Sequence, residues 1–220
     1  GRIPVEGHIG VVPSPETGYR MRARLHLRGG RIGFFLEGTH QLCDAGLTRQ
    51  LLPDAVRAGR ELADRLAAAG FAEDADVELS ENRAGDQRAM HIELTRAGAR
   101  GPVPPVEPIH AVTGLSWRTA GGGGTVGVYG LPYVEDVVRG VRLRRHARVF
   151  FQGNRYLLDA LVSAVIDACE PGPVVDLYAG VGLLGLCVAA SGRHEVVAVE
   201  GHEETAADLE VNARPLGAAV

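Results

Sequence analysis

The 220-residue sequence contains no lysine, only three cysteines and no long apolar run. All 23 positive residues are arginines, which base composition explains as well as function does. Cys43, Cys169 and Cys187 lie far apart and form no CxxC or Cys/His spacing, which argues against a zinc or iron–sulfur site. The longest apolar stretch, 183–190, is far shorter than a membrane span, and no signal peptide is visible. We therefore expect a cytoplasmic protein without a metal site or membrane contact.

Charge is divided unevenly along the chain. Residues 1–148 carry 20 arginines against 17 acidic residues (+3), whereas residues 149–220 carry 3 against 10 (−7). A basic first part favours a nucleic-acid partner, although drift in composition gives the same asymmetry. The length and the hydrophobic share of 45% allow one large domain or two small ones. We place a domain boundary after Arg148, where the sequence pattern also changes.

The first part predicts antiparallel strands with one basic face. Over 20–28, apolar and polar residues alternate with a period of two, which is typical of a strand. One face of this strand carries Arg20, Arg22, Arg24, His26 and Arg28. Gly29 and Gly30 suit a turn into a returning strand at 31–36, so the pattern predicts a hairpin.

A helix and a second hairpin follow. Apolar residues recur at helical spacing over 48–69, where Pro53 marks the helix start or a kink. Strands on either side of a turn at 82–86 predict the second hairpin. Residues 98–108 and 121–124 are rich in proline and glycine and predict loops. The first part is therefore expected to be a small α+β domain.

After Arg148 strands and helices alternate, which is typical of a parallel α/β sheet. The expected elements are a helix from Asn154 to about Cys169, strands at 174–178 and 196–200, and helices at 183–190 and 203–213. Two strands and their helices do not complete a doubly wound sheet, which usually has five or more strands. The sequence therefore predicts the start of a Rossmann-like sheet that continues beyond Val220.

A glycine-rich loop joins the first of these strands to its helix. Gly180, Gly182 and Gly185 stand in GxGxxG spacing, and Glu200 ends the next strand. Glycines let a ligand approach the backbone, and a carboxylate at the second strand tip accepts hydrogen bonds from both ribose hydroxyls. This order predicts a nucleotide site, with a tight turn that binds nothing as the alternative.

Asp176 bears on which nucleotide the loop binds, because NAD and S-adenosylmethionine share this architecture. A dinucleotide fold usually has only apolar residues before the first glycine, whereas Asp176 lies four residues before Gly180. A carboxylate there suits a cationic, methionine-bearing ligand and disfavours a pyrophosphate. S-adenosylmethionine is therefore the predicted cofactor, and an NAD-dependent oxidoreductase is the less favoured alternative.

Two motifs resemble those of a known family. Residues 150–154 read Phe-Phe-Gln-Gly-Asn, and residues 176–182 read Asp-Leu-Tyr-Ala-Gly-Val-Gly. They look like the FxQxN and DLYxGxG motifs of RNA uracil-5-methyltransferases, which are class I S-adenosylmethionine-dependent enzymes. The run 15–25, with Gly33 and Phe34, is similar to that family's central domain.

The resemblance extends from about Ser14 to Asn212 and implies a fold and a set of binding residues. An α+β central domain at 1–148 would precede the first part of a methyltransferase α/β domain at 149–220. Contacts to S-adenosylmethionine are implied for Gln152, Tyr178, Gly180, Gly182 and Glu200. Phe150 and Gln152 would face a uracil flipped out of the RNA.

The family's reaction uses residues that we do not expect in this chain. A cysteine thiolate adds to carbon 6 of uracil, carbon 5 accepts the methyl group, and a base removes the carbon 5 proton. In the family this cysteine and a glutamate lie well downstream of the second strand, so both are expected beyond Val220. The three cysteines present are interpreted as buried structural thiols.

The implied substrate is transfer or ribosomal RNA. Arginines could hold its phosphates by charge and by bidentate hydrogen bonds. The candidates are Arg20, Arg22 and Arg24 on the first strand and Arg144 and Arg145 before Phe150. A solvated face whose arginines pair with nearby acids is the alternative. A non-catalytic RNA-binding fragment is therefore the rival to an enzyme.

Overall fold

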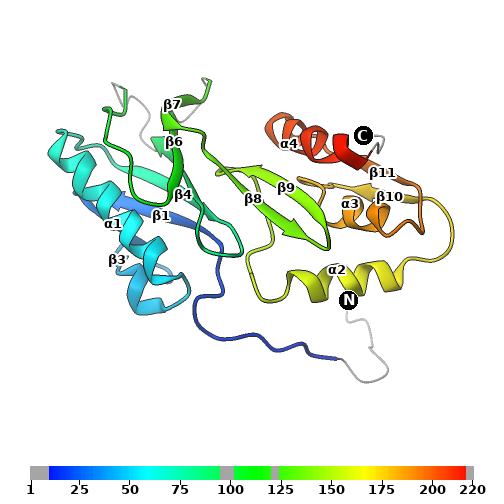
Figure 1. Cartoon of the computed structure of the whole chain (residues 1–220). Coiled ribbons are helices and arrows are strands. Elements are labelled where there is room, and N and C mark those ends of the chain that lie inside the picture. Colours follow the sequence, from blue (N-terminus) through cyan, green and yellow to red (C-terminus); the bar gives the residue numbers. More distant parts are fainter. Residues whose placement is uncertain (1–9, 95–101, 120–123, 217–220) are drawn as a thin grey trace.

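The computed structural model describes residues 10–94, 102–119 and 124–216, whose elements form two groups with a hairpin between them (Figure 1). The first group comprises β1 (Arg22–Arg28), β2 (Arg31–Phe35), β3 (Leu42–Cys43), η1 (Ala45–Thr48), α1 (Pro53–Ala68), β4 (Ala75–Glu81), β5 (Arg88–Leu94), β6 (Val112–Thr119) and β7 (Val126–Gly130). The hairpin comprises β8 (Tyr133–Val138) and β9 (Val141–His146). The second group comprises α2 (Leu158–Ala168), β10 (Val174–Leu177), α3 (Leu183–Ala190), β11 (Val196–Val199), α4 (Glu203–Ala213) and η2 (Arg214–Leu216).

The first group is one sheet of seven strands in the order β3-β2-β1-β4-β5-β6-β7. Neighbouring strands are antiparallel except β5 and β6, which are parallel. Both predicted hairpins are confirmed, with turns between β1 and β2 and between β4 and β5. Strands β6 to β9 were not predicted. Of the predicted loops, 102–108 contains no helix or strand, whereas 98–101 and 121–123 lie outside the described residues.

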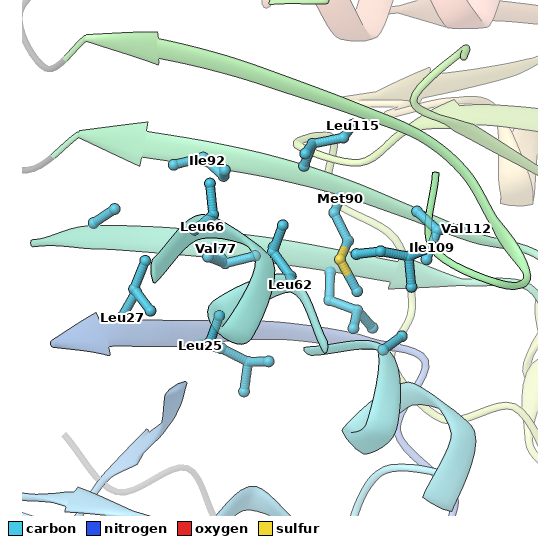
Figure 2. Packing of buried hydrophobic residues seen from close by; sticks show 14 of the residues in the cluster. Leu25, Leu27, Leu62, Leu66, Val77, Met90, Ile92, Ile109, Val112 and Leu115 are labelled. Atoms are coloured by element: carbon cyan, nitrogen blue, oxygen red, sulfur yellow. The ribbon is translucent and has the colours of Figure 1, made fainter. Parts of the chain in front are cut away.

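One face of the seven-stranded sheet is apolar and packs on α1. The alternation predicted for β1 is confirmed, because Ala23, Leu25 and Leu27 are all at most 2% exposed. In Figure 2, Leu62 and Leu66 of α1 lie over this face. Pro53 is the first helical residue rather than a kink, a position where its missing N–H costs nothing.

The opposite face of this sheet is polar, and we call it the polar face. Strand register places arginines of β1 opposite carboxylates of β4, and histidine and serine side chains follow on β5 and β6. Its members include Arg22, Arg24, His26, Asp76, Glu78, His91, Glu93, Ser116 and Arg118. This face is turned toward the β8–β9 hairpin and the second group.

The second group is a parallel pair of strands with helices. The predicted strands and helices are confirmed: α3 and α4 have the expected bounds, and β10 and β11 end one residue earlier than expected. α2 begins at Leu158, four residues after the expected Asn154. The core of this group also includes residues of β8–β9 and its turn, among them Val138, Val141 and Leu143. The boundary after Arg148 stays a prediction.

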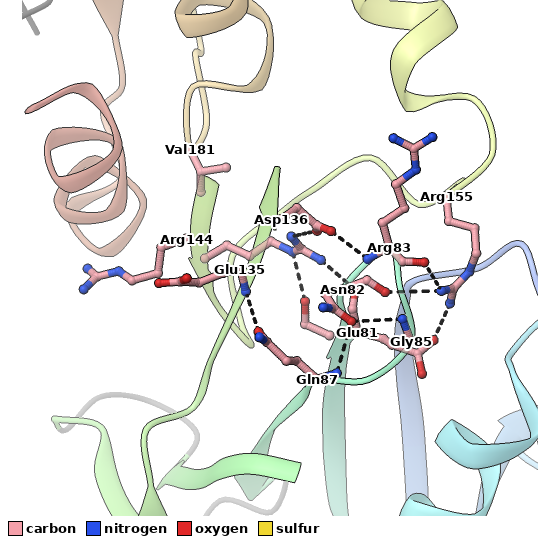
Figure 3. Close-up of polar contacts among 12 residues, drawn as sticks. Glu81, Asn82, Arg83, Gly85, Gln87, Glu135, Asp136, Arg144, Arg155 and Val181 are labelled. Atoms are coloured by element: carbon pink, nitrogen blue, oxygen red, sulfur yellow. Dashed lines mark hydrogen bonds and ion pairs between the residues drawn. The ribbon is translucent and has the colours of Figure 1, made fainter. Parts of the chain in front are cut away.

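Buried arginines hold the two groups together (Figure 3). Arg155, 4% exposed, donates to the carbonyls of Gly18, Asn82 and Arg83 at 2.8, 3.2 and 2.8 Å and pairs with Glu81. Backbone hydrogen bonds pair 19–21 with 153–155 across the same junction. The segment that follows β9 is therefore fixed against the edge of the first group.

Candidate functional site

The backbone of the loop after β10 requires glycine at position 182 and leaves open space beside position 180. Gly182 has φ +94°, and a Cβ there would lie 2.5 Å from Leu186 Cδ1. Gly180 has φ +59° with nothing within 4 Å of an added Cβ. Tyr178, also at positive φ (62°), is 91% exposed. The loop therefore presents bare backbone and an exposed aromatic ring to a ligand.

Glu200 is held against this loop. Its Oε2 accepts a hydrogen bond from the Gly180 N–H at 2.9 Å, and its Oε1 accepts one from the His202 N–H at 2.8 Å. Each carboxylate oxygen can accept a second hydrogen bond. The carboxylate expected at the tip of the second strand is thus fixed beside the glycine loop and retains free acceptor capacity.

Asp176 has a different position. Its Oδ2 accepts a hydrogen bond from the Gly185 N–H at 2.9 Å, in the first turn of α3. Burial raises the pKa of Asp176, and the hydrogen bond from Gly185 opposes that rise. This carboxylate satisfies one of the unpaired N–H groups of the helix start. Its predicted contact with a cofactor stays a prediction.

A cleft of about 410 Å³ lies between the polar face and the loops that follow β9, β10 and β11. We call this space the cleft. The polar face contributes Arg22, Arg24, Glu78, Glu93 and Arg118. The opposite side is lined by Arg148, Val149, Phe150, Tyr178, Gly180, Glu200, His202, Glu204 and Thr205. Residues from the two predicted domains therefore meet around one space.

The arginines of the cleft are paired with carboxylates. Arg22 and Arg24 both contact Glu78, at 3.1 and 2.6 Å. Arg118 contacts Glu93 at 2.9 Å, and Arg148 pairs with Glu204. The sequence left two interpretations of the basic face, a phosphate-binding surface or arginines paired with nearby acids. In the structure, acids on neighbouring strands pair with the arginines of the cleft. The cleft therefore offers matched donors and acceptors rather than a strong positive field.

Two of the other candidate arginines, Arg20 and Arg144, lie outside the cleft. Arg20 donates to Gln50 Oε1 at 2.7 Å, and its guanidinium lies 5.5 Å from the centre of the Phe34 ring. Arg144 bonds Asp208 at 2.9 Å and is 4.4 Å from the Tyr133 ring centre. Neither lines the cleft.

Arg145 does not fit its predicted RNA contact. It is 0% exposed and is held by Asp136 at 2.5 Å, by the Ser80 hydroxyl at 3.1 Å and by the Glu81 carbonyl at 2.6 Å. Arg145 lies on the same face of β9 as the buried Val141 and Leu143, and the sequence analysis did not show this because it predicted no strand there. The side chain is structural.

The two side chains expected to face a base point to different spaces. Phe150 is 64% exposed and lines the cleft. Gln152 lines a separate, mostly apolar pocket of about 350 Å³ along α2, beside Leu157 and Leu161. Phe150 therefore shares a space with Tyr178 and Glu200, and Gln152 does not.

Sequence reasoning missed several residues of the cleft, among them Glu93 and Arg118. They stand directly opposite one another on β5 and β6. Alternation over 88–94 already places Glu93 on the face opposite Met90 and Ile92, so that residue was accessible to the same pattern argument. Arg118 was not, because the strand that carries it was not predicted.

The cysteines do not contribute to the cleft. Cys187 is 2% exposed, and burial raises the pKa of its thiol to about 11, as expected for a structural thiol. Cys43 and Cys169 are half-buried, and neither lines the cleft. Among the described residues, no group of three or more histidine, cysteine or acidic side chains is placed to hold a metal ion. No helix in the described ranges has the length and apolarity needed to cross a membrane.

Sequence comparison finds RNA methyltransferases. The chain is 41% identical over 73 residues to a 23S rRNA (uracil(747)-C(5))-methyltransferase of Pyrococcus horikoshii, covering 33% of this chain and 18% of that protein. It is 26% identical over 207 residues to an uncharacterized RNA methyltransferase of Parasynechococcus marenigrum, covering 81% of this chain and 44% of that protein. No family model matches. The chain thus spans less than half the length of these curated relatives.

Structure comparison agrees over a longer stretch. The tRNA (uracil-54, C5)-methyltransferase of Pyrococcus abyssi, solved with S-adenosyl-L-homocysteine, superposes with a TM-score of 0.65. The match covers 93% of this chain and 54% of that one at 18% identity, which shows a shared fold. The resemblance predicted from the two motifs is thereby confirmed: the chain is a relative of RNA methyltransferases and has the fold of a uracil-C5-methyltransferase over nearly its whole length.

Proposed function

We propose that this chain forms the S-adenosylmethionine-binding and RNA-facing part of an enzyme that methylates carbon 5 of a uridine in transfer or ribosomal RNA. The observation that carries the proposal is the cleft, where Tyr178, Gly180 and Glu200 face Arg22 and Arg24. A nucleoside cofactor site and a surface rich in hydrogen-bonding groups thus border one space. The names of the relatives and of the structural neighbour support the same chemistry.

The described residues fit S-adenosylmethionine. When bound, this cofactor supplies an electrophilic methyl group. Glu200 can accept hydrogen bonds from the ribose hydroxyls, since its oxygens each keep one free acceptor site beside the exposed backbone of Gly180. The exposed ring of Tyr178 can pack against the ligand. Asp176 orders the start of α3 directly behind the loop.

The other side of the cleft fits a base taken out of an RNA strand. Phe150 offers an exposed ring for stacking, which is how proteins commonly hold unpaired bases. The ion pairs of Arg24 with Glu78 and of Arg118 with Glu93 provide donors and acceptors side by side. These match the mixed hydrogen-bonding edge of a base better than they match a phosphate, which takes donors alone. We place the target base here.

The described residues that line the cleft include no cysteine to act as the nucleophile that this chemistry needs. The part of the reaction that this chain supports is binding: it holds the cofactor, stacks the base and brings the two together. A chain with these properties alone would be a non-catalytic RNA-binding fragment.

A binding measurement tests the cofactor half of the proposal. Titration calorimetry of the protein should show S-adenosylmethionine binding, and Glu200→Ala should weaken it about tenfold or more, because a hydrogen bond to a charged group contributes about 1.5–3 kcal/mol. Glu195→Gln, at the opposite end of β11, is the matched control and should bind normally. Binding of NAD instead of S-adenosylmethionine would overturn the proposal.

A transfer assay tests the reaction. The assay uses the protein at its full natural length, because the part described here offers binding groups but no cysteine in the cleft. That protein is incubated with methyl-labelled S-adenosylmethionine and separate transfer and ribosomal RNA pools, and the RNA is then digested to nucleosides. Label in 5-methyluridine from one pool would establish the reaction and its substrate class. Cofactor binding without label in either pool would leave the binding role and remove the uracil-C5 assignment.

A further inference from the structure

A further pocket, separate from the cleft and from the pocket beside Gln152, opens where the start of α1 meets the segment before α2, and its volume is about 560 Å³. We call it the junction pocket. Its lining is Thr17, Gly18, Gly46, Arg49, Leu51, Leu52, Pro53, Val56, Arg57, Arg60 and Tyr156. Three arginines and one tyrosine thus surround an apolar base of leucine, proline and valine. In contrast to the cleft, no carboxylate among the described residues lines it.

Arg49 is the arginine that gives this pocket its charge. It is exposed, and no ion pair to it is found among the described residues. Its backbone is fixed, because the Arg49 carbonyl accepts from the Gly18 N–H at 2.8 Å and the Arg49 N–H donates to the Gly46 carbonyl at 3.2 Å. The backbone from which the Arg49 side chain extends is therefore held at the edge of the pocket.

The other two arginines keep donors available. Arg57 contacts Asp54 at 2.5 Å and Arg60 contacts Asp44, each through Nη2 only, and their side chains are 69% and 54% exposed. A guanidinium has five N–H donors, so each can still bind an anion from the pocket side. The three arginines outnumber these two aspartates, so the pocket carries a net positive charge.

Tyr156 adds a stacking surface. It is 42% exposed, and its hydroxyl lies 3.7 Å from the position of a Cβ on Gly18. An aromatic ring beside free guanidinium donors, over an apolar base, is the combination that binds a nucleotide through its ring and its phosphate together. An acidic peptide would use the arginines but would gain less from the tyrosine, so the nucleotide is favoured.

The junction pocket and the cleft are close along the chain. Gly18 lines the pocket and Arg22 lines the cleft, and four residues span at most about 14 Å. On the other side of the junction, Tyr156 and Phe150 belong to one segment that is fixed by Arg155. One RNA strand could therefore contact both sites.

We infer that the junction pocket binds a phosphate-bearing nucleotide of the RNA strand, a few nucleotides away from the base that enters the cleft. The inference rests on the proposed function, because RNA is its substrate. The pocket would supply the charge that the cleft lacks, since the arginines of the cleft are already paired. Affinity and base placement would thus come from different sites.

Equilibrium binding of fluorescently labelled transfer RNA and ribosomal RNA fragments, measured over a range of salt concentrations, tests the inference. Arg49→Ala should weaken binding and lower the slope of log affinity against log salt by about 0.7–0.9, the value for one lost phosphate contact. Tyr156→Ala should weaken binding without changing the slope, whereas Tyr156→Phe should bind like the wild type. Arg193→Ala, which removes an exposed arginine in the loop before β11, is the matched control and should leave both quantities unchanged.

Several outcomes would overturn the inference. One is RNA binding that is unaffected by Arg49→Ala, another is an equal loss in Arg193→Ala, and a third is no RNA binding at all. S-adenosylmethionine binding, measured on the same variants, distinguishes a failure of this inference from a failure of the proposed function. If the cofactor binds normally but RNA binding does not depend on Arg49, only the role of the junction pocket is contradicted. If the cofactor does not bind but RNA binding depends on Arg49, only the proposed cofactor role is contradicted.

Discussion

The seven-stranded sheet and the pair β10–β11 use their faces differently. The larger sheet has one apolar face under α1 and one polar face, so both are satisfied within the described residues. The parallel pair has α3 on one side and a bare apolar face on the other. That bare face carries Val175, Leu177, Val197 and Val199, which are 46–63% exposed. The first sheet can thus be stable as it stands, whereas the second offers an apolar surface that parallel sheets normally cover.

The two sheets also contribute different kinds of groups to the cleft. The residues of the larger sheet that face the cleft are paired and fixed, while the loop after β10 presents sterically open backbone at Gly180 and an exposed tyrosine. A rigid surface thus faces the loop to which we assign the cofactor. The junction between the two groups then determines how they face each other, and it is where the largest effect is expected.

Arg155→Met should destabilise the protein most, by about 3–5 kcal/mol, because it removes one of the two buried arginines that pair with Glu81, together with the hydrogen bonds that Arg155 donates to three carbonyls. Urea unfolding at neutral pH measures the loss. Arg142→Met, which breaks the exposed pair with Glu135, is the control and should cost no more than about 1 kcal/mol. Equal costs in the two variants would show that the junction is not held by Arg155.

A matched pair of leucines compares the two sheets directly. Leu25→Ala in β1 should cost about 2–5 kcal/mol, because Leu25 is 1% exposed under α1. Leu177→Ala in β10 should change stability by less than about 0.5 kcal/mol, because that side chain is 63% exposed. The same unfolding measurement serves both. A large cost for Leu177→Ala would mean that another surface covers the face of β10–β11 in solution.

Much of this fold could be predicted where one physical rule decided the outcome. Period-two alternation placed β1 and its faces, helical spacing with Pro53 placed α1, and the glycine loop placed β10, α3 and Glu200. These elements depend on short-range patterns that survive without tertiary context. Glu200, predicted at the tip of the second strand, lies beside the glycine loop and accepts a hydrogen bond from the Gly180 N–H at 2.9 Å, whereas its contact with a cofactor stays a prediction.

The remainder depended on pairing between distant segments. β6 is rich in glycine, serine and threonine and pairs in parallel with β5, which no local pattern announces. Whether an arginine is free or paired is likewise set by the strand beside it: Arg24 faces Glu78, which is 54 residues away. The sequence could show a basic face but could not show that its charge is cancelled. Because the arginines of the cleft are paired, we propose the phosphate contact at the junction pocket instead of at the cleft.

The polar face also carries a pH dependence, which arises from a buried histidine. Burial, with Arg148 next in importance, lowers the pKa of His91 to about 2, whereas the unfolded value is 6.5. The unfolded chain therefore binds an extra proton below about pH 6.5, so stability is lost as pH falls below that value. His91→Gln should reduce the slope of unfolding free energy against pH in this range by up to about 1.4 kcal/mol per pH unit.

Chemical unfolding of the wild type and of His91→Gln between pH 6.5 and 4.5 measures the slope of unfolding free energy against pH for each protein. His110→Gln, which replaces an exposed histidine, controls for the loss of one imidazole. His146, whose pKa burial lowers to about 4, remains in every variant, so some acid sensitivity should persist. Identical slopes in wild type and His91→Gln would show that His91 is accessible to protons in the folded protein.

Asp176 gives the smallest expected effect and separates its two possible roles. As the acceptor for the Gly185 N–H, it should contribute about 1 kcal/mol, which Asp176→Ala loses and Asp176→Asn largely keeps, because the amide oxygen still accepts. If its charge also contacts a cationic cofactor, Asp176→Asn should bind S-adenosylmethionine more weakly while unfolding almost like the wild type. Calorimetry and urea unfolding on both variants distinguish these cases. Normal cofactor affinity in Asp176→Asn would leave Asp176 as a helix-capping residue, so that the loop and Glu200 alone define the cofactor side of the cleft.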